Sequence, residues 1–469
     1  FFSVALVWGE IVSRGAMTTE PSLDGFSVWQ VRDYGGKLCM VTLPNRYQVK
    51  NELGSGTGGI VCQCDDVVGN RKVAVKNVTK RLTNPQEAIR VLRELKVMRH
   101  LDACRHIVTM HSAFRCGQSA NNPWGDVYIV MELMDTDLGD IIQSGMVSKE
   151  FVPYFTRHIL QGLKYMHSCG IVHRDLKPQN LLVNSEDSTL KIADFGSARD
   201  VDMAETAHVV TRWYRAPELL LSLPYDTAVD IFSVGCILGE LIKSCHIDEK
   251  ILEKRPVSAV LFPGAHWNEQ LRLIVQLVGV SQDDLQEVSS LETRDRLRAI
   301  ANANQHQQQQ WKNTFPMITA DEETLLRALL HFSARKRPTA EEALNFVYVE
   351  GGYDDEEDEE LTLPEFQADY ENLKDLSLIH DELNKELEVY NSAAPECSGM
   401  PAAASSTSNG TSTAAHCPVD TTTAQTPGDA MVLNTPSSDN ANSNDAVTPA
   451  SDTMEDLADQ LTPAMSMDS

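Results

Sequence analysis

The chain has 469 residues, with 40 Lys and Arg against 67 Asp and Glu, so its formal net charge is −27. This charge is uneven: residues 1–350 carry 38 basic and 42 acidic side chains, whereas residues 351–469 carry 2 basic and 25 acidic ones. Such an acidic excess repels phosphate backbones and argues against a general nucleic-acid binder. No run of 18 apolar residues occurs, so no membrane-spanning helix is expected.

The beginning of the chain and its cysteines bear on the compartment. Residues 1–12 are apolar apart from Glu10 and lack a basic start, and the first Met is Met17, so we interpret residues 1–16 as upstream translation or a truncated start. A secretory signal peptide is the alternative. The ten cysteines show no CxxC spacing, which favours reduced thiols in a cytoplasmic protein, with nuclear entry left open. Cys62 and Cys64 are expected on one face of a strand, as packing residues.

The predicted elements divide the body of the chain into two parts. After an N-terminal extension, residues 1–46, the pattern is typical of β-structure, with short apolar strands at residues 73–75 and 127–131. Between these strands, residues 86–101 carry apolar side chains at intervals of three, which predicts a helix. Helical patterns dominate later, and residues 228–242 are apolar on nearly all sides, which predicts a buried helix.

Three polar tracts are expected outside the core. Residues 301–310, ANANQHQQQQ, predict a surface loop. Residues 354–360, DDEEDEE, form a charge run. Residues 392–469 are rich in Ala, Ser, Thr, Asn and Pro and cannot bury enough apolar area to offset their ordering entropy, so we predict disorder there.

The first motif is a glycine-rich segment that ends in an apolar strand. Glycines allow the backbone to approach phosphates closely. A dinucleotide-binding reading requires a following helix, but another strand pattern follows instead. The segment consists of Leu53, Gly54, Ser55, Gly56, Thr57, Gly58, Gly59, Ile60 and Val61. Lys76 ends the next strand, VAVK, where it can reach a phosphate, and Glu94 on the predicted helix can pair with it.

Further motifs supply groups for phosphoryl transfer. In the segment HRDLKPQN, Asp175 can orient a hydroxyl and accept its proton, Lys177 can neutralise a phosphate, and Asn180 can offer an amide oxygen to Mg²⁺. In DFG, the Asp194 carboxylate can bridge Mg²⁺ to nucleotide phosphates. Each motif alone is weak evidence of function. The chain contains the glycine-rich segment, VAVK, HRDLKPQN, DFG and APE in this order, and such an ordered set very rarely arises by chance.

Residues 47–349 resemble a eukaryotic protein kinase domain. The resemblance implies an α+β, two-lobed fold: a smaller lobe with a five-stranded sheet and one helix, a larger helical lobe, and ATP between them. It also implies roles for single residues. Lys76 would hold the α/β-phosphates and pair with Glu94, Asp175 would be the catalytic base, and Asn180 and Asp194 would hold Mg²⁺. Met131 would be the gatekeeper, Glu132–Met134 would bind adenine, and Arg337 would pair with Glu218.

Other segments are similar to those of mitogen-activated protein kinases (MAP kinases). They are VYIVMELMDTDL at residues 127–138, TRWYRAPE at 211–218 and LFPG at 261–264. This resemblance implies a serine/threonine kinase that uses ATP and Mg²⁺, phosphorylates Ser/Thr-Pro sites of protein substrates, and is activated by an upstream MAP kinase kinase. A cyclin-dependent-type kinase and a non-catalytic scaffold with the kinase fold are the alternatives.

The activation motif departs from the family pattern. MAP kinases carry Thr-x-Tyr where this chain has Thr206, Ala207 and His208, and histidine takes no stable tyrosine-type phosphate. Activation by a single phosphate on Thr206 is our hypothesis. The alternative is a constitutively active kinase in which His208 only affects loop packing. By resemblance, Arg90, Arg93 and Arg174 would bind the phosphothreonine, while Arg212 and Arg215 lack their usual phosphotyrosine.

The acidic run also has a counterpart in this family. Residues 350–391 align with an acidic docking segment and a C-terminal extension that packs on the kinase. Asp354 and Glu357 match the acidic docking residues, which would attract basic-hydrophobic peptides of partners. A solvated acidic turn is the alternative reading. The tail further contains four Thr-Pro pairs, which makes it a candidate for autophosphorylation.

Overall fold

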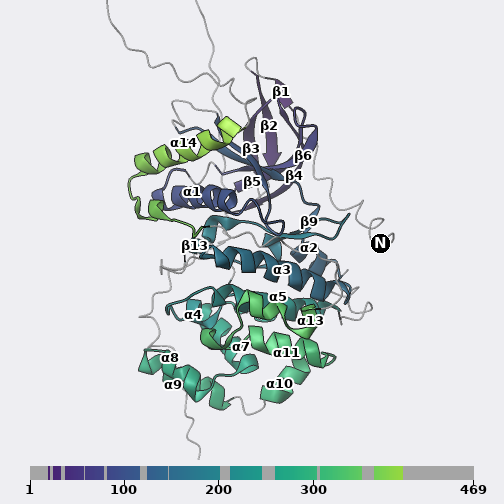
Figure 1. Cartoon of the computed structure of the whole chain (residues 1–469), viewed down its shortest axis with the longest axis vertical. Helices are drawn as coiled ribbons and strands as arrows, with labels where there is room; N and C mark the ends of the chain where they lie inside the picture. Colours follow the sequence, from purple (N-terminus) through teal and green to yellow (C-terminus); the bar gives the residue numbers. More distant parts are fainter. Residues whose placement is uncertain are drawn as a thin grey trace, which may run out of the picture. The chain divides into compact units, whose positions relative to one another are not determined.

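The computed structural model describes residues 19–21, 25–32, 37–56, 59–78, 82–116, 124–145, 147–200, 212–245, 259–303, 307–350 and 364–393 (Figure 1). The strands are β1 (Thr19–Pro21), β2 (Phe26–Arg32), β3 (Leu38–Pro44), β4 (Tyr47–Gly56), β5 (Gly59–Asp66), β6 (Arg71–Asn77), β7 (Met110–Cys116), β8 (Asp126–Glu132), β9 (Thr136–Asp137), β10 (Ile171–Val172), β11 (Leu181–Val183), β12 (Leu190–Ile192) and β13 (Arg199–Asp200).

The helices are α1 (Pro85–His100), α2 (Leu138–Gln143), α3 (Phe151–Ser168), α4 (Pro217–Leu220), α5 (Ala228–Cys245), α7 (Trp267–Val278), α8 (Gln282–Glu287), α9 (Leu291–Ala303), α10 (Gln307–Thr314), α11 (Ala320–Leu329), α12 (Ala340–Leu344), α13 (Val347–Glu350) and α14 (Leu376–Ala393). Short 3-10 turns cover Pro178–Asn180, Phe195–Ser197, Ala334–Lys336 and Asp369–Asn372. Within these ranges, no helix combines the length and the apolar character that crossing a membrane requires.

The smaller lobe is built on an antiparallel sheet in the order β4-β5-β6-β8-β7, with α1 as its helix. This arrangement confirms the predicted five-stranded sheet with one helix. Cys62 and Cys64 are both buried on one face of β5, as predicted. Helix α1 begins where the sequence favours a start: the side chain of Asn84 accepts a hydrogen bond from the backbone N–H of Gln86, and Pro85 follows as the first helical residue.

The N-terminal extension contributes to this lobe. Strands β1, β2 and β3 form a second antiparallel sheet. Trp29 and Val31 of β2 and Val41 and Leu43 of β3 are buried in the same hydrophobic cluster as the stacked rings of β4, β7 and β8. The extension therefore supplies part of the core of the smaller lobe.

The larger lobe surrounds α5, which is buried along almost its whole length, as the sequence predicts. Helices α8, α11 and α12 each begin with a capping box, in which a Ser or Thr side chain and an acidic side chain satisfy backbone N–H groups. The surface loop predicted for residues 301–310 is wrong for residues 301–303, which end α9, and for residues 307–310, which begin α10, while residues 304–306 lie outside the described residues. Glutamine is a good helix former, and the buried Trp311 holds α10 against the lobe.

Residues 364–393 return to the smaller lobe, and Figure 1 shows α14 alongside α1. The segment begins against the larger lobe, where the backbone N–H of Phe366 donates to the carbonyl of Cys169. On α14, buried His380 donates from Nε2 to the carbonyl of Leu82, and its ring stacks on Trp124. We call residues 364–393 the C-terminal extension.

Candidate active site

Lys76, at the end of β6, occupies the centre of a buried ion-pair group. Its Nζ donates to Oε1 of Glu94 on α1 and lies 3.5 Å from Oδ1 of Asp194. The side chains of Lys76 and Glu94 are almost inaccessible to solvent, whereas that of Asp194 is 37% exposed. The predicted pairing of Lys76 with Glu94 is therefore present, and the exposed carboxylate beside it remains accessible to a ligand.

The segment around Asp175 is held by short polar contacts. Nζ of Lys177 donates to Oδ2 of Asp175 at 2.8 Å, and Nδ2 of Asn180 donates to the backbone carbonyl of Asp175 at 2.8 Å. Because its amide nitrogen is used in this way, Oδ1 is the atom with which Asn180 can ligate a metal. The sequence-predicted residues Asp175, Lys177 and Asn180 thus form one cluster.

A carboxylate on α5 fixes the backbone of this segment. The backbone N–H groups of His173 and Arg174 donate to Oδ2 and Oδ1 of Asp230, each at 2.8 Å. Asp230 is fully buried, and His167 also lies within hydrogen-bond distance, at 3.1 Å. Burial alone would raise the pKa of Asp230, but the hydrogen bonds from His167 and Arg174 hold this pKa below its ordinary value. Asp230 remains ionised and determines the path of the chain toward Asp175.

In the sequence, Asp230 is only an acidic residue within the otherwise apolar stretch of residues 228–242. A carboxylate within an otherwise buried helix needs donors, and this need was the signal that marks it as functional.

The DFG segment has a strained backbone. Asp194 has φ 65° and ψ 74°, in the left-handed region that residues with a Cβ seldom adopt. Phe195 is fully buried and makes an edge contact with the ring of His173, with ring centroids 5.5 Å apart. Nε2 of His173 lies 3.1 Å from the carbonyl oxygen of Ala193. These contacts on both sides of Asp194 hold its carboxylate near Lys76.

The described part of the glycine-rich segment ends β4 at Gly56 and begins β5 at Gly59. Gly59 has φ 122°, and a Cβ placed there would lie 1.9 Å from the carbonyl oxygen of Asn77, so only glycine fits. Ser55 pairs with Ile60, and Gly56 pairs with Gly59. Leu53 is exposed on β4. Thr57 and Gly58, the predicted tip of the loop, lie outside the described residues.

The proposed adenine-binding segment follows directly from β8. Met131 is partly buried and packs on the core, and Met134 is buried. The carboxylate of Glu132 accepts hydrogen bonds from the backbone N–H of Thr109 at 2.6 Å and from Nζ of Lys191 at 2.7 Å. The backbone N–H of Glu132 also donates to the carbonyl of Thr109, at 3.0 Å, so a nucleotide would have to contact this residue at its carbonyl oxygen.

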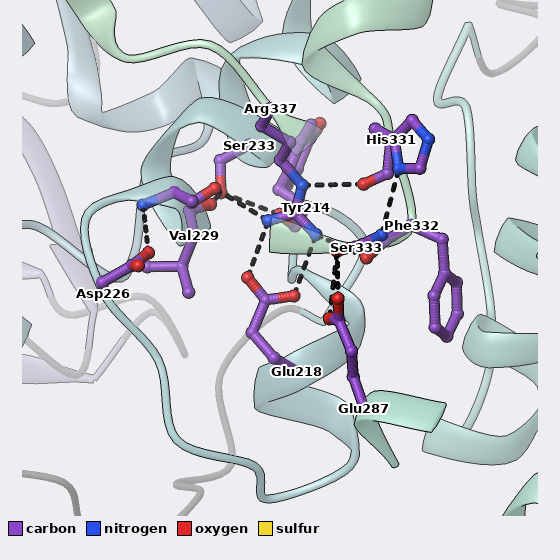
Figure 2. A network of polar contacts seen from close by, with 11 residues as sticks. Tyr214, Glu218, Asp226, Val229, Ser233, Glu287, His331, Phe332, Ser333 and Arg337 are labelled. Carbon is purple, nitrogen blue, oxygen red and sulfur yellow. Dashed lines mark hydrogen bonds and ion pairs between the residues drawn. The ribbon is translucent and has the colours of Figure 1, made fainter. Parts of the chain in front are cut away.

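Glu218 and Arg337 form the predicted pair in the larger lobe. The guanidinium of Arg337 donates to both carboxylate oxygens of Glu218, at 2.6 and 2.9 Å, and also to the carbonyls of His331 and Phe332 (Figure 2). Both side chains are buried. The pair ties the start of α4 to the turn before α12, and thereby supports the APE segment.

The arginines predicted to bind the phosphothreonine contact different partners in the structure. Arg90 pairs with Glu87 on the surface of α1. Arg93 is bound by Glu371 of the C-terminal extension, at 2.5 and 2.7 Å. Arg174 has φ 69°, and its guanidinium lies over the ring of Tyr225. Thr206 and His208, the candidate switch residues, lie outside the described residues, as do Asp354 and Glu357.

Two further arginines were predicted in the activation segment. Burial lowers the pKa of Arg215, although the neighbouring carboxylate of Asp175 opposes this effect. Arg212 follows directly after the residues that are not described and also lies close enough to affect Arg215. Arg215 therefore lies beside the catalytic cluster.

Arg199 is a basic residue of this region that the sequence motifs did not predict. Burial lowers the pKa of Arg174, and the charges of Arg199 and Arg93 lower it further against the opposing effect of Tyr225. The three guanidinium groups are therefore neighbours. Arg199 follows DFG by three residues, but no motif read from the sequence pointed to it.

The donor set fits a magnesium–nucleotide complex. Asp194 offers a carboxylate and Asn180 an amide oxygen, and hard oxygen ligands are those that Mg²⁺ prefers. Lys76 supplies the neighbouring positive charge for phosphates, and the glycines at the end of β4 and the start of β5 are residues that allow close backbone approach to a phosphate. The arrangement suits positioning and charge neutralisation during phosphoryl transfer.

Comparisons with known proteins agree with this chemistry. The protein kinase domain family matches residues 47–349. "Mitogen-activated protein kinase hog-1" of Neurospora crassa is 38% identical over 327 residues, which cover 69% of this chain and 84% of that protein. "Mitogen-activated protein kinase 5" of Oryza sativa subsp. indica is 37% identical over 364 residues, or 74% and 93%. "Extracellular signal-regulated kinase 1" of Dictyostelium discoideum is 37% identical over 345 residues, or 72% and 60%. The chain belongs to the protein kinase family and, within it, is a serine/threonine kinase of the MAP kinase type.

Proposed function

We propose that this kinase transfers the γ-phosphate of ATP to Ser or Thr residues that precede Pro in protein substrates. The observation that carries the proposal is the ion-pair group of Lys76, Glu94 and Asp194 together with the hydrogen-bonded pair of Asp175 and Asn180. The backbones of the two sets are joined where the N–H of Ala193, next to Asp194, donates to the carbonyl of Asn180 at 2.9 Å. A scaffold without catalysis has no need for this group. The preference for Pro rests on the likeness to MAP kinases.

The residues divide the work of transfer. Asp175 orients the substrate hydroxyl and accepts its proton, while Lys177, whose Nζ lies 2.8 Å from Asp175, brings positive charge to the phosphate that is transferred. Lys76 binds the nucleotide phosphates and is kept in place by Glu94. When bound by Asp194 and Asn180, Mg²⁺ supplies charge neutralisation of the phosphates.

The test uses labelled ATP and a protein substrate with Ser/Thr-Pro sites, and compares the full chain with Asp194→Asn. We expect incorporation to fall to background in the variant, because a metal-binding carboxylate is lost while its shape is retained. A substrate with Ala in place of the Pro serves as the control for specificity. Equal incorporation by both proteins would reject kinase chemistry, and equal use of both substrates would reject the preference for Pro.

We further propose that partners reach the kinase through charge and phosphorylation. An upstream MAP kinase kinase would modify Thr206, and the basic groups Arg174 and Arg199 would bind that phosphate. Asp354 and Glu357 would bind basic-hydrophobic docking peptides in a protein of the cytoplasm and nucleus. A docking peptide that binds Asp354→Asn with Glu357→Gln as tightly as the parent would refute the docking role.

A further inference from the structure

Arg93 of α1 joins three parts of the chain that are far apart in sequence. Its Nε and Nη2 donate to the two carboxylate oxygens of Glu371, at 2.5 and 2.7 Å, and its Nη1 donates to the carbonyl of Gly196 at 2.8 Å. The side chains of Arg93 and Glu371 are each 4% exposed. A bidentate pair of this kind, shielded from water, has a defined geometry and is strengthened by its surroundings.

The carboxylate of Glu371 lies in a region that contains several arginine side chains. The charges of Arg93 and Arg199 both lower the pKa of Arg174, and both also reach Tyr370. Like charges that are buried or partly buried repel one another and are stabilised by an anion nearby. Among the described residues, Glu371 is the carboxylate that binds Arg93 directly.

The position of Arg93 bears on catalysis through both of its neighbours. Glu94, the next residue of α1, holds Lys76, and Gly196 is the third residue of the DFG segment that begins with Asp194. A shift of Arg93 would therefore move the Lys76 partner and loosen the backbone that follows Asp194. Glu371 itself touches neither the nucleotide-binding lysine nor the metal-binding carboxylate, so any effect on chemistry must pass through Arg93.

We propose that Glu371 is a positioning residue of the kinase: it supplies Arg93 with an anion from within the chain, so that the catalytic arrangement forms without a phosphate on the activation segment. A phosphate on Thr206 would then act through Arg174 and Arg199 and add to an existing activity. The inference rests on the kinase activity proposed above and assigns to the C-terminal extension a role in it.

The chain offers a matched control for this role. Glu386 of α14 binds Arg99 of α1 through two hydrogen bonds and lies 3.7 Å from Lys96. Its removal weakens the attachment of the extension but leaves the contact between Glu371 and Arg93 unchanged. Glu371→Gln and Glu386→Gln therefore each remove one carboxylate from the same interface, and only the first acts on Arg93.

The experiment places these variants in a full-length Thr206→Ala chain and measures kcat, the KM for ATP and thermal stability. We expect the kcat of the Thr206→Ala parent to be clearly higher than the background activity of Asp194→Asn. Glu371→Gln should lower its kcat about tenfold or more, because a buried guanidinium loses its charged partner. Glu371→Asp, which keeps the charge, should recover part of that loss, and Glu386→Gln should leave kcat within about twofold while lowering stability.

Hydrogen exchange in α1 gives a second readout that does not depend on turnover. Faster exchange around Arg93 in Glu371→Gln than in Glu386→Gln supports the proposal. It is overturned if both variants change kcat and exchange equally, if Glu371→Gln leaves kcat unchanged, or if Glu371→Asp is no better than Glu371→Gln. If the Thr206→Ala parent is no more active than Asp194→Asn, phosphate-independent activity is contradicted. If the chain without any substitution also lacks activity, the proposed function itself is contradicted.

Discussion

Two adjacent residues of α1, Arg93 and Glu94, form buried ion pairs that differ in where their partners come from. Glu94 binds Lys76, 18 residues earlier in the chain and within the matched kinase domain. Arg93 binds Glu371, 278 residues later and beyond residue 349, where the kinase match ends. One face of α1 is therefore fixed by the catalytic site and the other by the C-terminal extension. The difference shows that the position of α1 is shared between the domain and a segment outside it.

The substitution Glu94→Gln removes the charge that pairs with Lys76 on the catalytic face of α1. Lys76 would keep a hydrogen-bond acceptor but lose a buried negative charge, and breaking a buried pair costs about 3–5 kcal/mol. If most of this cost falls on binding and transfer, kcat/KM should fall about 10²-fold or more. Steady-state kinetics measure the effect. Glu87→Gln, which removes a partly exposed carboxylate from the same helix, serves as the control and should change kcat/KM less than about twofold.

A fall in kcat/KM of less than threefold in Glu94→Gln would contradict the importance of this face. In that case, the carboxylate of Asp194, 3.5 Å away, would be sufficient to hold Lys76.

The extension face can be weakened without touching Arg93 by Glu386→Gln. Glu386 is 3% exposed, but its partner Arg99 is 46% exposed, so solvent screens the pair on one side. We expect the free energy of unfolding to fall by about 1 kcal/mol, between the values for surface and buried charged hydrogen bonds. Urea denaturation measures this loss. Unchanged stability would show that His380 and Tyr370 suffice to attach the extension.

The smallest expected effect is a pH dependence of this attachment. Burial lowers the pKa of His380, and the charge of Arg115 lowers it further, whereas the carbonyl of Leu82 and the charge of Asp381 oppose the shift. Arg115 donates toward Nδ1 of His380, so the neutral ring with a proton on Nε2 fits its surroundings.

The direction of the effect follows from this shift. The unfolded chain binds a proton near pH 6.5, while the folded chain resists it, so this stabilisation is present above pH 6.5 and is lost as the pH falls below that value. The difference in unfolding free energy between the parent and His380→Gln should therefore shrink between pH 7.5 and pH 5.5, by about 1 kcal/mol at most. A constant difference across this range would exclude titration of His380.

Local pattern was sufficient for the parts of the site that lie on single elements. Intervals of three in residues 86–101 predicted α1, and the spacing of VAVK from the glycine-rich segment predicted Lys76 beside a phosphate-binding turn. The order of the motifs predicted the fold. In each case, residues near each other in sequence, or motifs that always occur together, carried the information.

The remaining features depend on contacts between distant segments. Nothing near Glu371 shows that its partner is Arg93, because a carboxylate in an acidic extension resembles any solvated one. The contribution of β2 and β3 to the core was missed for a different reason. Residues 29–32, WQVR, alternate between apolar and polar side chains, but so short an alternation is a weak signal for a strand. The glutamine-rich α10 was predicted as a loop because composition was weighed above helix propensity.

The carboxylate of Asp230 has a consequence for how the catalytic segment moves. It binds the amide hydrogens of His173 and Arg174 from within α5, the most deeply buried helix of the larger lobe. Exchange of those two amides with solvent requires that Asp230 withdraws, which disturbs the core around α5. We therefore expect both amides to exchange about as slowly as the core of the larger lobe, although they lie on a loop.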